Sequence, residues 1–88
     1  MNERRSESRK AVMVRVELAW EDAAGVSHTA QGKLEDKSPR GVAMRVTEEV
    51  PAGLRLRIKS PTGEFSGVVV RCQSVKRGFL LGVQRDTV

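Results

Sequence analysis

Hydrophobic and polar residues alternate along most of the chain, and this alternation predicts β-strands. In the first strongly patterned stretch, the apolar side carries Val12, Val14, Val16 and Leu18. A period of two with β-branched residues is typical of a strand. A helix would instead place Arg15 inside the apolar stripe, which disfavours that alternative. The first strand is therefore predicted from Ala11 to Trp20.

Five further segments show a similar pattern and are separated by turn-forming sequences. The predicted strands cover a weaker segment at 28–36 and then 42–47, 54–59, 65–75 and 79–84. The intervening turns contain Gly or a Pro followed by Gly, as in "KSPRG" and "SPTGE". Six short strands without a convincing helix predict an all-β fold, a small six-stranded antiparallel barrel whose closure removes exposed edges.

The pattern also assigns the less common residues. We expect Trp20, Phe65 and Phe79 in the core and Cys72 as a half-buried apolar residue. His28 is expected at the surface or at a turn edge. The basic residues of the fourth strand are expected on its solvent face, with a partner-binding surface as the alternative; they are Arg55, Arg57 and Lys59.

Composition narrows the function classes. The chain has 88 residues, enough for one domain, and carries one cysteine, one histidine and no tyrosine. No internal disulfide can form, and neither a nucleophile–base pair nor a metal-ligand set is visible, so we expect no enzyme, no metal and no cofactor. No long apolar run and no signal-peptide pattern are present, which favours a cytoplasmic location. The formal net charge of +5 favours a polyanionic partner.

Two short motifs carry candidate ligand chemistry. The first is Arg5-x-x-x-Arg9, and the second is Asp36-x-Ser38-x-x-Gly41 in the turn before the third strand. Guanidinium groups suit phosphate oxygens, the guanine Hoogsteen edge and purine faces. A carboxylate such as that of Asp36 accepts from the N–H donors of a guanine edge, and a serine hydroxyl donates or accepts. We expect Gly41 to adopt unusual dihedrals and to let a base approach closely.

The two motifs, in this order on a six-stranded pattern, resemble the PilZ domain family of bacterial cyclic di-GMP receptors. The segment "SGVVVRCQSVKRGFLLGVQ" is similar to the family's two closing strands. The resemblance implies ligand contacts from Arg5, Arg9, Asp36, Ser38 and Gly41. Arg40 and Arg71 are secondary candidates. Arg4 is a further candidate because an extra guanidinium there can stack on a second ligand molecule.

The resemblance also implies an organisation and a mechanism. Residues 1–10 would form a flexible ligand-binding arm, and residues 11–88 the barrel. The arm would close over one cyclic di-GMP or an intercalated pair, and an effector domain or partner protein would read the change. PilZ domains often continue into a C-terminal helix, which we expect to be absent or truncated here. Without such a helix, the chain could self-associate, for example as a homodimer. The alternative is that the sequence is one domain of a longer protein.

Two alternative hypotheses for the function remain. One is a basic nucleic-acid-binding barrel of the OB or SH3 type, which the charge permits but the 3% aromatic content disfavours. The other is a PilZ-like interaction module that binds no ligand. For the arginines of the first motif, a solvated tail is the simplest alternative.

Overall fold

The computed structural model describes residues 10–86, so Arg4, Arg5 and Arg9 lie outside the described part of the chain. All six predicted strands are present. They are β1 (Lys10–Glu21), β2 (Ser27–Lys37), β3 (Gly41–Val46), β4 (Arg55–Ser60), β5 (Gly63–Val75) and β6 (Gly78–Arg85). No helix occurs within residues 10–86. The predicted all-β class is therefore confirmed, although β1, β2, β5 and β6 are each two residues longer than expected, with 12, 11, 13 and 8 residues.

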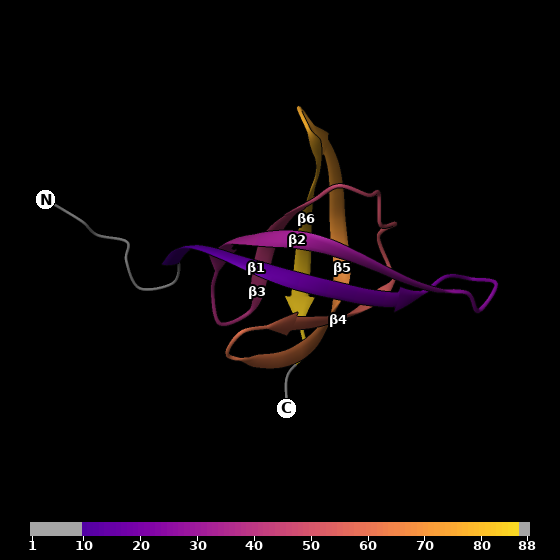
Figure 1. The fold of residues 1–88 in the computed structure, drawn as a ribbon, viewed down its shortest axis with the longest axis horizontal. Coiled ribbons are helices and arrows are strands. Elements are labelled where there is room, and N and C mark those ends of the chain that lie inside the picture. The colour runs from indigo at the N-terminus through magenta and orange to yellow at the C-terminus, as the bar shows by residue number, and fades with distance from the viewer. Residues whose placement is uncertain (1–9, 87–88) are drawn as a thin grey trace, which may run out of the picture.

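The strands close into an antiparallel barrel in the order β1-β2-β3-β6-β5-β4. Hairpins join β1 to β2, β2 to β3, β4 to β5 and β5 to β6. Two pairings are not hairpins: β3 with β6, and β1 with β4, which closes the barrel. In Figure 1, β1 and β2 run across the view in front of the nearly vertical β5 and β6. The pairing of β3 with β6 brings the turn before β3 next to the last strand.

The barrel interior is filled by the alternating apolar residues. Leu18, Met44, Leu56, Ile58 and Leu81 are fully buried. No polar or charged side chain of the described residues is buried. The hydrophobic effect therefore drives closure, because every strand contributes apolar side chains to one interior. Val50, in the segment predicted only as a turn, is also completely buried.

The rarer residues lie largely where the pattern placed them. Trp20 is buried, while Phe65, Phe79 and Cys72 are half-buried and pack against the core. His28 stacks on Trp20 with ring centroids 5.4 Å apart, and its Nε2 lies 2.8 Å from Oδ2 of the turn residue Asp22. This confirms a turn-edge position for His28. The basic residues of β4 are exposed as expected; they are Arg55, Arg57 and Lys59.

Candidate ligand-binding site

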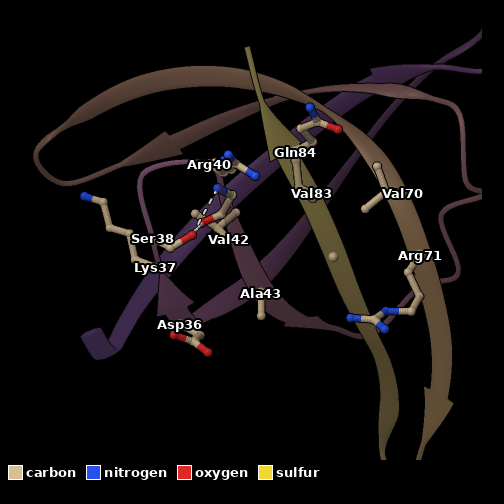
Figure 2. A pocket seen from close by; sticks show the side chains of 12 residues that line it. Asp36, Lys37, Ser38, Arg40, Val42, Ala43, Val70, Arg71, Val83 and Gln84 are labelled. Carbon is tan, nitrogen blue, oxygen red and sulfur yellow. Dashed lines mark hydrogen bonds between the residues drawn. The ribbon is translucent and has the colours of Figure 1, made fainter. Parts of the chain in front are cut away.

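Four residues from four strands form one row across the outside of the barrel. Asp36 on β2 pairs with Ala43 on β3, and Ala43 pairs with Gly82 on β6. Gly82 in turn pairs with Arg71 on β5. A carboxylate and a guanidinium thus begin and end a row whose two middle residues are Ala and Gly. Figure 2 shows Asp36 and Arg71 on opposite sides of Ala43.

A shift in strand register turns each charged residue away from the core. Leu34 is buried, so strict alternation would direct Asp36 inward as well. The register of β2 with β3 shifts between Leu34 and Asp36, and Glu35 is the additional residue. β5 contains a similar irregularity. Its register with β6 shifts between Val69, which is buried, and Arg71, so that Val70 is the additional residue. Such bulges re-aim side chains, and they often lie next to functional sites.

The two middle residues of the row, Ala43 and Gly82, have small side chains and form a floor between the longer side chains of Asp36 and Arg71. Three strand spacings separate the backbones of Asp36 and Arg71, which corresponds to about 14 Å. A Cβ placed on Gly82 would lie 3.7 Å from the Arg71 Cβ and 3.8 Å from its Nε. The Arg71 side chain therefore lies over Gly82, and Figure 2 shows it extending from β5 toward β6. The extra residue Val70 stands beside it and is 56% exposed.

The turn between β2 and β3 closes on itself through Ser38. The Ser38 N–H donates to the Gly41 carbonyl at 2.9 Å. The Ser38 hydroxyl lies 3.3 Å from both the carbonyl oxygen and the N–H of Gly41, and the Arg40 carbonyl accepts from the Arg85 N–H at 2.9 Å. The bonds between Ser38 and Gly41 close the turn, and the bond between Arg40 and Arg85 attaches it to β6. A satisfied turn of this kind is also a preorganised edge for a ligand site.

The expected dihedral role of Gly41 is wrong. Gly41 is not among the glycines with positive φ, which in the described chain are Gly25, Gly53, Gly63 and Gly78. Its requirement is steric instead, because a Cβ there would lie 2.6 Å from the Val83 carbonyl oxygen. The bare backbone lets β3 approach β6 closely and so fixes the turn next to the row.

Together these elements surround a hollow of about 370 Å³. It is lined by Asp36, Lys37, Ser38, Arg40, Gly41, Val42, Ala43, Val70, Arg71, Gly82, Val83 and Gln84. All five described candidates of the sequence analysis line it: Asp36, Ser38, Arg40, Gly41 and Arg71. Lys37, Arg40 and Arg71 give the rim a positive balance, which favours an anionic ligand.

Sequence reasoning missed the floor and the apolar wall. These residues are Ala43, Gly82 and Val70, and alternation alone places them on the solvent face without indicating a site. The available signal was the four-residue run "VVVR" followed by the half-buried Cys72, which breaks strict alternation in β5. A break of this kind inside a strand indicates a bulge.

A larger hollow, of about 650 Å³, lies near the end of β1 around Trp20, His28, Arg55 and Arg57. It shares no lining residue with the smaller hollow. None of the three residues of the second motif, which the structure describes, lines it. Position relative to the second motif therefore distinguishes the smaller hollow as the candidate site.

Comparison with known proteins identifies the family of the chain. The PilZ domain model matches residues 3–87, nearly the whole chain, and the chain belongs to the PilZ domain family. That family is known for receptors of cyclic di-GMP and is generally non-catalytic. Among curated proteins, none matches the chain significantly.

Two further features of the described chain concern metal-binding clusters and membrane-spanning helices. Within residues 10–86, no group of His, Cys, Asp and Glu side chains is arranged to hold a metal ion. The same part of the chain contains no helix long and apolar enough to cross a membrane.

Proposed function

We propose that this protein is a non-catalytic receptor that binds cyclic di-GMP in the hollow over β2, β3, β6 and β5. The observation that carries the proposal is the row Asp36–Ala43–Gly82–Arg71, in which a hydrogen-bond acceptor and a guanidinium face each other across a floor of small residues. Membership of the PilZ family supports the choice of ligand.

Each part of the row suits one part of this ligand. The Asp36 carboxylate, which only accepts hydrogen bonds, matches the N1–H and N2–H₂ donors of guanine. The Arg71 guanidinium forks onto phosphate oxygens or a guanine edge, and it stacks on a purine face. Ala43 and Gly82 let a flat base lie close to the backbone, and Val70 offers it an apolar side contact.

The position of the β1 start supports the role of Arg5 and Arg9. Lys10 pairs with Lys37, and Ala11 pairs with Asp36. Arg9 is thus attached one residue before a backbone that lies beside the Asp36 turn. We propose that residues 1–10 form the arm that closes over the ligand, with Arg5 and Arg9 as contacts. Arg4 would then stack on a second molecule, which favours an intercalated pair over a single ligand.

The output in this proposal is the position of the closed arm. A neighbouring domain or a partner protein in the cytoplasm reads it, and no metal or cofactor takes part. Ordering an arm on binding costs conformational entropy, so the affinity would be moderate and salt-dependent.

Isothermal titration calorimetry with cyclic di-GMP tests the proposal. Wild type should release heat on binding, whereas Arg9→Ala and Asp36→Ala should bind much more weakly. The stoichiometry decides between one molecule and two per domain. No heat with wild type, or unchanged binding in both variants, would overturn the proposal. A gel shift with generic RNA and DNA separates it from the nucleic-acid-binding alternative.

A further inference from the structure

A second hollow, of about 270 Å³, lies on the outer face of β1, β2 and β3 beside the β5–β6 turn. Four of its eight lining residues are cationic: Arg15, Lys33, Arg45 and Arg77. We call these four residues the basic patch. None of them belongs to the two motifs, and the cyclic di-GMP proposal gives them no role.

Three members of the basic patch stand directly opposite one another. Arg15 on β1 pairs with Lys33 on β2, and Lys33 pairs with Arg45 on β3. Like charges at directly opposite positions destabilise a sheet. The barrel therefore carries an electrostatic cost at this row, which an anionic partner would remove.

Only Arg45 has a carboxylate partner in the described chain. Its Nε donates to Oε2 of Glu35 at 2.7 Å, and this hydrogen bond raises the pKa of Arg45. Within residues 10–86, no carboxylate lies within salt-bridge distance of Arg15, Lys33 or Arg77. Three exposed cations around one hollow thus remain available to a partner.

The surroundings of the basic patch favour a short acidic segment over a nucleic acid. Glu17 follows Arg15 on the same face of β1, Glu35 lies against Arg45, and Glu48 follows the lining residue Thr47. A long polyanion that extended past the patch would meet these carboxylates. The described chain also offers no exposed aromatic side chain on which bases could stack, because Trp20 is buried and both phenylalanines are half-buried.

We propose that the basic patch docks an acidic segment of a partner protein. Arginine forks match carboxylates in bidentate geometry, and a shallow, exposed patch suits a peptide better than a small enclosed ligand. The patch shares β2 and β3 with the candidate ligand site, and Glu35 directly precedes Asp36. A partner docked here would therefore touch the protein next to the ligand. The inference does not depend on the identity of that ligand.

Lys33→Glu is the informative variant, since it separates binding from folding. A glutamate at position 33 would stand between Arg15 and Arg45, so two repulsive neighbours would become attractive. The melting temperature should rise. Lys59→Glu on the outer face of β4 changes the net charge equally and serves as the control, although it faces Glu17 and Glu64 and should lower the melting temperature.

Fluorescence anisotropy with a labelled peptide of alternating Glu and Ser, at about 0.15 M salt, measures docking. Each exposed cation–carboxylate pair contributes up to about fivefold to a binding constant. Lys33→Glu removes one cation and adds one anion, so binding should weaken by about tenfold or more, while Lys59→Glu binds like wild type. A matched Gln/Ser peptide should not bind.

Three results would overturn the proposal. The first is no binding of the acidic peptide to wild type. The second is equal loss in Lys33→Glu and Lys59→Glu, which would indicate a non-specific charge effect. The third is a single-stranded oligonucleotide that binds more tightly than the peptide and displaces it, which would assign the patch to nucleic acid. None of these results would change the outcome expected for cyclic di-GMP binding in calorimetry, so the two proposals are tested independently.

Discussion

Replacing glycine by alanine at two positions distinguishes a structural glycine from a ligand-site glycine. Gly41 and Gly82 pair with residues of neighbouring strands on the same side of the barrel. A Cβ at Gly41 would lie 2.6 Å from the Val83 carbonyl oxygen, a backbone atom that cannot rotate away. A Cβ at Gly82 would meet nothing closer than 3.7 Å.

The two substitutions should therefore move stability in opposite directions. Gly41→Ala forces β3 and β6 apart and should cost about 1–3 kcal/mol of unfolding free energy, as overpacking does. Gly82→Ala fits without strain and restricts the unfolded chain, so it should add about 0.5–1 kcal/mol. For a domain of this size, that gain corresponds to a melting temperature higher by about 2–8 °C.

Binding should separate from stability at Gly82. The added methyl group raises the floor between Ala43 and Arg71, and a base that lies on this floor must shift. Even the low end of an overpacking cost, about 1 kcal/mol, weakens binding about fivefold. Circular dichroism melts and calorimetry with cyclic di-GMP measure both quantities on the same samples. Wild-type affinity in a stabilised Gly82→Ala would refute the role of the floor, and a destabilised Gly82→Ala would refute the steric argument.

Three further predictions address the guanidinium, the core and pH. Arg71→Lys should weaken cyclic di-GMP binding about tenfold, because an ammonium group cannot fork or stack, and should leave the melting temperature unchanged; equal affinity by calorimetry would contradict this. Leu81→Ala should lower the free energy of unfolding, measured in urea, by about 2–5 kcal/mol, since Leu81 is fully buried. A loss below about 1 kcal/mol would argue against that packing, because it is smaller than core truncations normally cost. The hydrogen bond that Asp22 shares with the His28 side chain, and then the one that it accepts from the Val26 N–H, lower the pKa of Asp22 below its ordinary value of 3.8. The folded state therefore gains stability above pH 3.8 and loses it as pH falls through the lowered pKa; the advantage of wild type over Asp22→Asn in thermal melts should vanish in strong acid, and a constant difference would count against it.

Much of the fold was predictable because period-two alternation is a local property. Leu54, Leu56 and Ile58 mark β4 without knowledge of its neighbours, and β4 appears at Arg55–Ser60. The burial of Val50 was not predictable in this way, because a single apolar residue in a turn has no period. Its position depends on how the segment between β3 and β4 folds back over the barrel.

The site was predictable in its residue types and not in its geometry. The motif with Asp36, Ser38 and Gly41 marks a turn from sequence alone, and the structure places all three around one hollow. The row that joins Asp36 to Arg71 depends on two register shifts and on the pairing of β3 with β6. These are long-range features, because a bulge is defined only against a partner strand.

Locating cyclic di-GMP on the barrel tests the proposed binding site most directly. Amide chemical shifts of the 88-residue chain are followed by two-dimensional NMR as cyclic di-GMP is added. We expect the largest changes on the Asp36–Gly41 turn and on Ala43, Arg71 and Gly82. Changes centred instead on Trp20 and His28 at the larger hollow, or no changes at all, would contradict the proposed site.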